Sequence, residues 1–236
     1  MEGRCKHQYV VSFSGGKDST AMLFMLLERG CRIDRIIYID TTKEFPQMYD
    51  HIEEVQKRIP MKIETYTIPF DYWFCEHVKT KGKAKGCIGY GWPTVRRRWC
   101  TELKTRTFSN ALKKIPSTVY VGLAVDETSR IQKLDKNKFA PLALWGVTEK
   151  DALEYCKRLG FTWGGLYDEG FPSVSCYLCP LQGMKSLELL YKNHKDLWRE
   201  MVELDRKSEY PFRPDCTLAQ LENRFELCYS LPAATL

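Results

Sequence analysis

The sequence lacks any long hydrophobic run. No apolar stretch approaches the ~20 residues that a helix needs to cross a bilayer, so a membrane-spanning helix and a membrane partner are excluded. The first seven residues contain no apolar core of the signal-peptide kind, which predicts a cytoplasmic location. There is no internal repeat and no low-complexity tail, so neither a repeat array nor a disordered chain is indicated.

What the chain does contain is an ordinary globular mixture with two biases. Hydrophobic residues make up 44% and charged residues 28%, and the net charge is +6. A basic chain suits a ligand that carries phosphate, and it permits a nucleic acid partner without requiring one. The second bias is ten cysteines in 236 residues. In a reducing compartment they are expected to be buried fillers or metal ligands rather than disulfides.

Segments rich in β-formers alternate with helical segments through the first half of the sequence. Gly30 fits the end of the first helix, and Pro46 fits the first turn of the second. Such alternation needs crossover connections, which predict an α/β fold with an open, mainly parallel five-stranded sheet and helices on both faces. Strands are expected at residues 8–13, 35–39, 62–68 and 118–123, and helices at 20–29 and 46–58.

The C-terminal third is predicted to be helical. Thr148 and Asp151 form a capping-box pattern ahead of a helix that ends at Leu159. Two more helices are expected at residues 187–206 and 218–227. We therefore expect an α/β domain over residues 1–145, with a basic and aromatic insertion at 70–99. A helical region over residues 146–236, which contains a Cys-x-x-Cys, is expected to pack with it as one unit.

Residues 14–19 read Ser-Gly-Gly-Lys-Asp-Ser and lie between a predicted strand and a predicted helix. Glycines let backbone N–H groups approach an anion closely, and the helix start adds free N–H groups and the positive end of its dipole. The spacing is too short for a Walker A loop. In this context the hexapeptide resembles the pyrophosphate loop of the N-type ATP pyrophosphatases, which implies that the 1–145 domain binds an adenine nucleotide.

Three further segments narrow the resemblance. Residues 40–46 (Asp-Thr-Thr-Lys-Glu-Phe-Pro), 122–130 (Gly-Leu-Ala-Val-Asp-Glu-Thr-Ser-Arg) and 141–145 (Pro-Leu-Ala-Leu-Trp) resemble, in order, stretches of phosphoadenylylsulfate (PAPS) reductase-like proteins. One departure is Ala124, where that family has an arginine. The nucleotide-binding residues that the resemblance implies are Ser14, Gly15, Gly16, Lys17, Asp18, Ser19, Asp40, Thr41, Gly122 and Glu127.

Three of the matched residues carry the expected catalysis. Lys17 and Arg130 would neutralise charge that develops on the phosphates, together with Mg²⁺, and Asp18 would position that ion. The plainer alternatives are that Asp18 is a helix cap and that Glu127 and Arg130 form a local ion pair.

Cys176 and Cys179 form the Cys-x-x-Cys, with Pro180 after it. Two thiols at this spacing can face one metal or cluster, or act as a redox pair. In cluster-bearing relatives a Cys-Cys pair lies where this chain has Trp99 and Cys100. The resemblance therefore implies three ligands, Cys100, Cys176 and Cys179, for a [4Fe-4S] cluster with one open iron. A four-thiolate cluster, with Cys87 as the fourth ligand or Cys216 behind it, and a zinc site are the alternatives.

The sequence also lacks the C-terminal Glu-Cys-Gly-x-His motif in which reductases of the family carry a catalytic cysteine. Cys228 is followed by neither the glycine nor the histidine, and all four histidines precede it. This absence favours ATP-dependent adenylation of an acceptor, followed by iron–sulfur-dependent sulfur transfer. A sulfonucleotide (PAPS or APS) reductase and a non-catalytic, nucleotide-binding redox sensor are the alternatives.

The insertion at residues 70–99 indicates what the acceptor could be. Its lysines at 79–85 and arginines at 96–98 alternate with Tyr90, Trp92 and Trp99, a pattern that suits an unpaired nucleotide of tRNA or DNA. A solvated basic face with a few core aromatic residues, or arginines that contact the bound nucleotide, would give the same pattern. A sulfur donor protein or free sulfide is the other expected partner, and the sequence does not exclude an oligomer.

Overall fold

The computed structural model describes residues 7–82, 84–113 and 115–230, with side chains as far as residue 227. At its centre lies an open sheet of five strands, all paired in parallel, in the order β3-β2-β1-β4-β5. The predicted fold class is thus confirmed. The strands are β1 (Gln8–Phe13), β2 (Arg35–Asp40), β3 (Ile63–Thr67), β4 (Ser117–Val121) and the short β5 (Lys138–Phe139).

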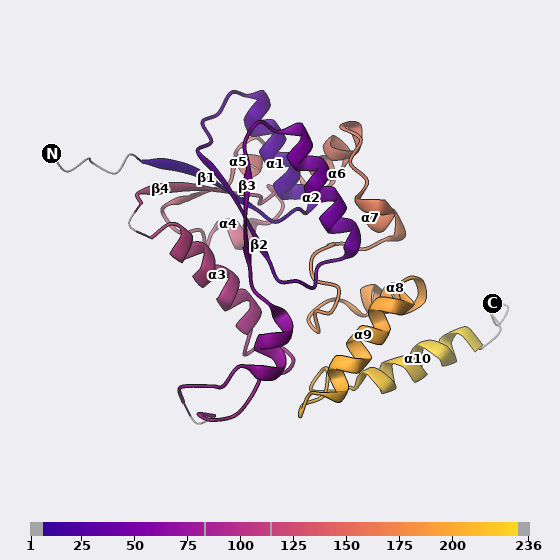
Figure 1. Cartoon of the computed structure of the whole chain (residues 1–236). Coiled ribbons are helices and arrows are strands. Elements are labelled where there is room, and N and C mark those ends of the chain that lie inside the picture. The colour runs from indigo at the N-terminus through magenta and orange to yellow at the C-terminus, as the bar shows by residue number, and fades with distance from the viewer. Residues whose placement is uncertain (1–6, 83, 114, 231–236) are drawn as a thin grey trace.

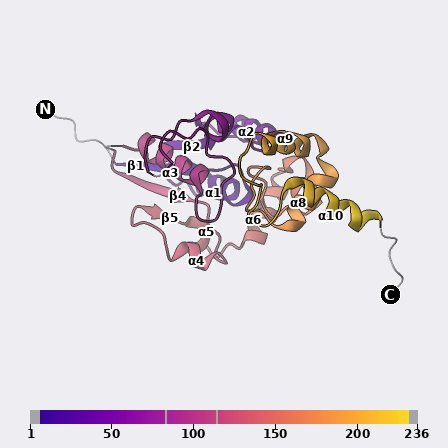
Figure 2. The same ribbon diagram turned by 90° about the horizontal axis from the view of Figure 1, so that it is seen from below.

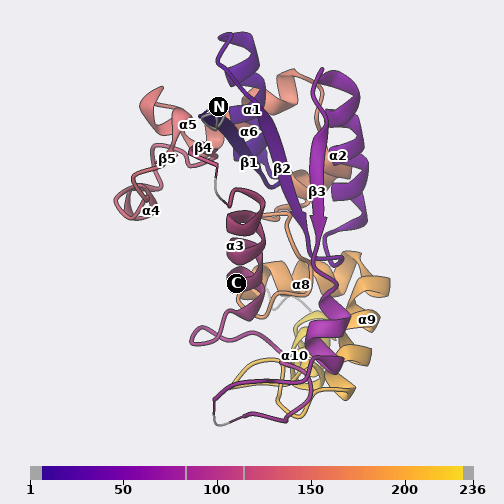
Figure 3. The same cartoon turned by 60° about the vertical axis from the view of Figure 1, so that its left-hand side comes forward.

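Helices cover both faces of the sheet (Figure 1). In Figure 3, α1, α2 and α6 lie on one side of the strands and α3 lies on the other. The described helices are α1 (Lys17–Glu28), α2 (Pro46–Arg58), α3 (Trp99–Ala111), α4 (Thr128–Ile131), α5 (Pro141–Leu144), α6 (Glu149–Arg158), α7 (Leu166–Glu169), α8 (Met184–Asn193), α9 (Lys195–Arg206) and α10 (Leu218–Ser230), with the turns η1 (Tyr72–Glu76) and η2 (Trp163–Gly165). No helix of the described chain is long and apolar enough to span a membrane.

The central strands are buried on both faces. Val10, Val11 and Ile36 have no exposed surface, as expected for parallel strands that helices cover on each side. From β1 the chain first adds β2 and β3 on one side and then β4 and β5 on the other, so the strand order reverses between β1 and β4. In open α/β sheets this switch point, at the carboxyl ends of the strands, is where ligands bind. The fold therefore directs attention to the residues that follow β1, β2 and β4.

The prediction of one continuous helix over residues 187–206 is wrong: the chain forms two helices there, α8 and α9. They are separated at His194, whose φ of −129° and ψ of 61° are not helical. The His194 ring packs against Phe45 and Phe171, and its Nε2 lies 3.0 Å from a Glu169 carboxylate oxygen. The break could not be predicted from the sequence, because no proline or glycine marks it. Contacts with residues far away in the sequence stabilise it instead. Figure 2 shows that α8–α10 gather on the side of the molecule opposite α3.

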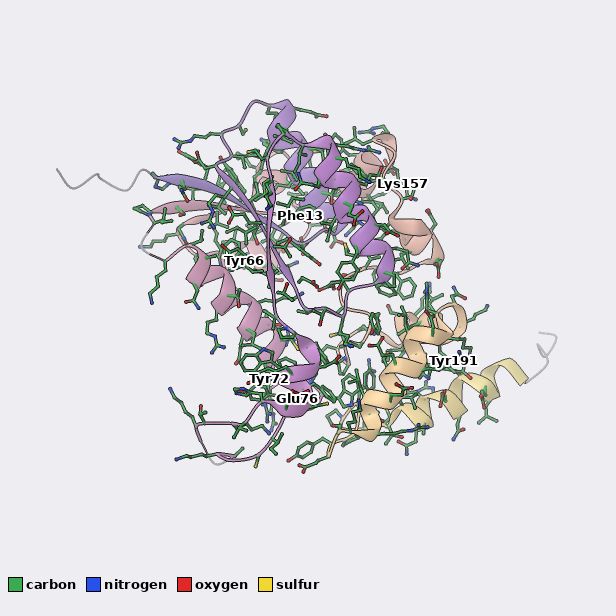
Figure 4. All side chains as sticks on the ribbon, viewed as in Figure 1. Phe13, Tyr66, Tyr72, Glu76, Lys157 and Tyr191 are labelled. Carbon is green, nitrogen blue, oxygen red and sulfur yellow. The ribbon has the colours of Figure 1, made fainter. Side chains whose placement is uncertain are left out.

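The insertion at residues 70–99 contributes to the core as well as to the surface. Tyr72 and Glu76, labelled in Figure 4, lie on its π-helical turn η1. Trp92 and Trp99 are only 5% and 3% exposed, and their indole N–H groups donate to Asp205 and to the Gly91 carbonyl. The two tryptophans are therefore structural, and of the three aromatic residues singled out in the sequence only Tyr90 keeps a partly exposed ring.

Candidate nucleotide and thiol site

The loop of residues 14–19 forms the expected junction between β1 and α1. Gly15 has a φ of 76°, a left-handed conformation that glycine adopts without strain. The Ser19 hydroxyl accepts from the Ser14 N–H at 3.2 Å and lies 3.0 Å from the Ser14 hydroxyl. These contacts close the loop on itself ahead of the first turn of α1. The N–H groups at the start of that helix are the donors that the sequence predicts for an anion.

Side chains from the C-terminal half hold the loop in place, and no local pattern in the sequence indicates them. The Trp163 indole donates to the Gly15 carbonyl at 2.8 Å, and the Tyr167 hydroxyl accepts from the Lys17 N–H at 3.0 Å. The buried His51 ring stacks on Trp163 at 4.4 Å, and burial lowers its pKa to about 3, so it stays neutral. The phosphate loop thus depends on residues almost 150 positions away.

Lys17 lies between two carboxylates. Its ammonium is 3.0 Å from Asp18 and 2.6 Å from Glu149, which begins α6. Burial alone would lower the pKa of Lys17, but the two carboxylates outweigh it and raise the pKa. Burial raises the pKa of Asp18, with Glu149 and Glu127 adding to the rise, while Lys17 opposes it. The loop therefore combines a firmly charged lysine with an acidic cluster next to the expected phosphates.

Gly122 packs directly on the phosphate loop. A Cβ atom at this position would lie 2.7 Å from the Ser19 nitrogen. Glu127 follows, and its carboxylate accepts from the Ala124 N–H at 3.0 Å and pairs with Arg130. The Arg130 side chain is 66% exposed. Glu127 and Arg130 therefore form the local ion pair that was one of the two alternatives in the sequence.

The end of β2 connects the loop to the cysteines. The Asp40 carboxylate accepts from the Thr42 N–H at 2.7 Å and from the Tyr49 hydroxyl at 3.0 Å. The Thr41 hydroxyl points elsewhere: it donates to Glu44 at 2.9 Å and lies 3.1 Å from the Cys176 sulfur. An isolated antiparallel bridge joins Glu44 to Cys176. Asp40 therefore orders its own turn, whereas Thr41 belongs to the group of residues around Cys100, Cys176 and Cys179.

A cavity of about 260 Å³ lies between the sheet and α3. It begins at Ser14, beside the phosphate loop, and reaches Glu44 and Lys104 near the cysteines. The strands contribute apolar side chains at the switch point, and α3 closes the other wall. The lining residues are Ser12, Phe13, Ser14, Ile37, Tyr38, Ile39, Glu44, Lys104, Thr105, Phe108, Ser109, Val119, Val121, Lys138 and Ser175.

Lys104 is the functional candidate that the sequence reading missed. Its ammonium lies 3.1 Å from the Glu44 carboxylate and 3.8 Å from the Cys176 sulfur. Burial alone would lower the pKa of Lys104, but Cys176 and Glu44 raise it, so the lysine is charged. Lys104 lies one helical turn after Cys100 on α3, and that i,i+4 spacing is the signal that could have revealed it.

The three predicted cysteine ligands lie within electrostatic reach of one another. Burial, with the Cys176 and Cys179 thiols adding to it, raises the pKa of Cys100. Burial and Glu44 raise the pKa of Cys176 to about 12, and Lys104 opposes them. Burial also raises the pKa of Cys179, against Lys104 and Arg98. Burial thus acts on all three sulfurs in the same direction, and Lys104 opposes it at each of them.

The alternative ligands lie apart from this set. Cys87 is exposed, and Cys216 pairs through its backbone with Arg213 while its thiol lies 3.9 Å from Asp215. Within the described ranges, no three histidine, cysteine or acidic side chains are arranged to hold a metal ion. The donor chemistry still suits a thiophilic metal, since Cys100 is close enough to Cys176 and Cys179 for them to raise its pKa, and no disulfide joins the three. The Cys228 side chain lies outside the described part.

The arginines at 96–98 diverge. Arg96 lines a groove with Pro180 and Arg213, Arg97 lies over the Tyr90 ring, and Arg98 acts on Cys179. None of them lines the cavity beside Ser14. The cavity's own charged lining is instead Glu44, Lys104 and Lys138.

The chain is an α/β protein with a glycine loop and a helix N-terminus at the switch point of a parallel sheet, an arrangement that in other proteins holds anionic ligands. The model of the phosphoadenosine phosphosulfate reductase domain matches residues 8–182, so the chain belongs to that family. The predicted resemblance is confirmed.

The chain is similar to several curated proteins. An uncharacterized protein of Methanocaldococcus jannaschii is 25% identical over 231 residues, which cover 86% of this chain and 42% of that protein. An adenosine 5'-phosphosulfate reductase of Bacillus pumilus is 26% identical, covering 61% of this chain and 62% of the reductase. A phosphoadenosine 5'-phosphosulfate reductase of Vibrio vulnificus is 27% identical, covering 70% and 64%. The chain thus spans less than two thirds of the length of each of these relatives.

Proposed function

We propose that the protein binds ATP in the cavity beside Ser14, activates an acceptor by adenylation and transfers to it a sulfur atom from an iron–sulfur cluster that Cys100, Cys176 and Cys179 would hold. One observation carries the proposal. The cavity that begins at the phosphate loop is also lined by Glu44 and Lys104, and both contact Cys176. A nucleotide in that cavity would have its phosphates at residues 14–19 and its reacting end near sulfur.

The proposed reaction has two steps, and different residues serve each of them. An acceptor oxygen attacks the α-phosphate of ATP, the bond to the β-phosphate breaks and pyrophosphate leaves. A sulfur nucleophile next displaces AMP from the adenylated acceptor. Lys17 and the N–H groups of the loop would stabilise the negative charge of the phosphates, and Asp18 and Glu149, which both contact Lys17, would hold the magnesium that accompanies ATP. Arg130 would join them only by leaving Glu127.

Cys100, Cys176 and Cys179 would hold an iron–sulfur cluster and leave one iron without a protein ligand; zinc is the alternative occupant. When bound, the cluster would supply the sulfide or hold the transferred sulfur. Lys104 would place a positive charge beside the thiolates, which favours their ionised form. Free sulfide or a sulfur donor protein would restore the sulfur after each cycle.

A sulfonucleotide reductase is the second candidate, because the named relatives are adenosine 5'-phosphosulfate and phosphoadenosine 5'-phosphosulfate reductases. The two functions differ in product. Adenylation releases pyrophosphate from ATP, whereas a reductase releases sulfite from the sulfonucleotide. Replacing Cys228 with serine would abolish reduction if that thiol were the nucleophile, and it would leave adenylation unchanged.

Replacing Ser14 and Lys17 with alanine is expected to remove ATP binding, because the double variant loses two side-chain donors and the loop's positive charge. Isothermal titration calorimetry with ATP and Mg²⁺ measures the binding affinity. Release of pyrophosphate in the presence of an acceptor measures turnover. Lys150→Ala, on the exposed start of α6, is the matched control, since its side chain is 84% exposed. Unchanged ATP affinity in the double variant would refute this placement of the site. Sulfite release with no pyrophosphate would favour the reductase.

Anaerobically prepared protein is expected to contain iron and acid-labile sulfide, and Cys100→Ser is expected to lose most of both, because the remaining pair cannot hold a cluster alone. Iron and sulfide assays together with the visible absorbance measure the loss. Cys31→Ser is the control, since Cys31 lies after α1 and away from the three thiols. Bound zinc in place of iron would contradict the cluster and support the alternative metal.

A further inference from the structure

The positive charge of the chain is concentrated in one stretch. Residues 77–106 contain nine lysines and arginines and one acidic residue, Glu102, whereas the whole chain has a net charge of only +6. The remainder of the protein is therefore slightly acidic. Such a concentration is the electrostatic footprint of a polyanionic partner rather than of a uniformly solvated surface. It follows the insertion and continues along the first two turns of α3.

An aromatic stack lies inside this basic stretch, with Tyr90 at its centre. The Tyr90 ring stacks on Trp73 at 6.0 Å, on His77 at 5.2 Å and on Trp99 at 5.6 Å. Trp99 is buried, but Trp73, His77 and Tyr90 are only partly covered. The stack is thus anchored in the core at one end and reaches the surface at the other. A set of stacked rings that reaches the surface is a platform on which a base can stack.

Cations surround the exposed end of the stack. Arg97 lies 5.2 Å and Lys79 lies 5.8 Å from the centre of the Tyr90 ring, and Arg106 lies 5.9 Å from that of Trp73. In the described chain neither Arg97 nor Arg106 has an ion-pair partner, and both are exposed. The Arg97 guanidinium also donates to the Tyr90 carbonyl at 3.1 Å, which holds it at the ring. Two guanidinium groups are therefore held beside aromatic rings without a carboxylate partner in the described chain.

These groups line a cavity of about 320 Å³ on α3. Its floor is apolar and its rim is charged. The lining is Tyr90, Trp99 and Leu103 with Arg97, Glu102 and Arg106. The cavity is separate from the one beside Ser14, because the two have no lining residue in common.

We propose that this face, defined by Trp73, His77, Tyr90, Arg97 and Arg106, binds an unpaired stretch of a polynucleotide. A base enters the cavity against Tyr90, and the neighbouring phosphates pair with the two arginines. A base can reach such a recess only when it is free of a duplex stack. The Glu102 carboxylate on the rim can accept from an exocyclic amine. An acidic peptide would use the charges but not the ring platform.

This inference deepens the proposed function, on which it rests for the role of the bound strand: the polynucleotide would be the acceptor. Arg98 follows Arg97 in the sequence, Cys100 lies three residues after Arg97, and Arg98 is close enough to Cys179 to interact with it electrostatically. A strand that crosses the start of α3 would pass from the base cavity toward the sulfur atoms. Binding itself needs neither ATP nor a cluster.

The test is fluorescence anisotropy of the full chain with labelled 12-nucleotide oligonucleotides, without ATP. Wild-type protein is expected to bind single strands and to bind a duplex of the same length more weakly. Tyr90→Ala should weaken binding about tenfold or more, as stacking losses do, and Tyr90→Phe should keep the affinity. Arg97→Ala with Arg106→Ala should lower the slope of log affinity against log salt by about 1.4 if each arginine pairs with one phosphate.

A matched double variant, Lys150→Ala with Arg199→Ala, removes the same charge from exposed positions of α6 and α9 and should leave the slope unchanged. Because Arg97 and Arg106 are exposed, their variant tests the site even if Tyr90→Ala disturbs the stack. RNA and DNA strands are compared, and tighter binding of one assigns the sugar that is recognised. Equal affinity of wild type and the arginine pair variant, or preference for duplex, would overturn the proposal. ATP affinity is measured on the same preparations. Loss of strand binding with normal ATP affinity would contradict only this inference, whereas absence of ATP binding would contradict the proposed function.

Discussion

Replacing Lys104 with methionine is expected to destabilise the protein by about 2–3 kcal/mol and to abolish sulfur transfer. Glu44 is the reason: its side chain is only 3% exposed, and Lys104 is the cation that contacts it. Removing that cation leaves a buried carboxylate without its counter-charge. Breaking one side of a buried pair usually costs 3–5 kcal/mol, and the cost here is smaller because water reaches the Lys104 side chain, which is 33% exposed.

The function suffers for a separate reason. Lys104 lies 3.8 Å from the Cys176 sulfur, and it opposes the burial that raises the pKa of Cys176 to about 12. Without the lysine the thiol becomes harder to ionise, because only the Thr41 hydrogen bond then opposes burial and Glu44. Since only the thiolate ligates a metal or attacks as a nucleophile, bound iron and turnover should both fall.

A double-mutant cycle separates the two effects. Lys104→Met combined with Glu44→Gln leaves no charge buried, so urea unfolding should recover most of the stability lost in the single variant, while turnover stays low. Lys104→Arg should retain stability because the positive charge is kept. If the two single substitutions added without coupling, the ion pair would not be what holds this part of the site together.

The local sequence signals were reliable where the chain's own chemistry decides the structure. The loop at residues 14–19 and the helix that begins at Pro46 lie where their glycines and proline indicated. The capping box of Thr148 and Asp151 is present, and α6 starts directly after Thr148. In each case residues a few positions apart determine the geometry, so a single sequence contains the information.

The missed features depend on contacts between distant segments. Lys17 meets Glu149 across 132 positions, and Tyr167 reaches the Lys17 N–H across 150. Trp92 and Trp99 look alike in a basic, aromatic stretch, yet both are buried, and only tertiary packing distinguishes them from Tyr90. Lys104 was overlooked because one lysine in a helix usually faces solvent. The candidate site was therefore predictable as a loop and a set of cysteines, but not as one cavity that joins them.

Gly122→Ala is expected to weaken ATP binding by tenfold or more and to destabilise the protein by about 1–3 kcal/mol, the usual cost of overpacking. The added Cβ would lie 2.7 Å from the Ser19 nitrogen, 2.8 Å from the Ser19 Cα and 2.9 Å from the Asp18 carbonyl carbon. All three atoms belong to backbone, so no side chain can rotate away. The first turn of α1 must move, and with it the N–H groups that hold phosphate.

Gly183→Ala is the matched control, because a Cβ at Gly183 meets nothing within 4 Å. Urea unfolding and ATP titration are measured on both variants. Since the Gly122 substitution alters no charge and no hydrogen-bonding side chain, a loss of affinity can come only from displaced backbone. Unchanged affinity together with reduced stability would mean that β4 can move away from the loop as a unit. Loss of affinity well beyond the loss of stability would mean that ATP binding depends on the position of the loop to within a few tenths of an ångström, as a site built from backbone N–H groups requires.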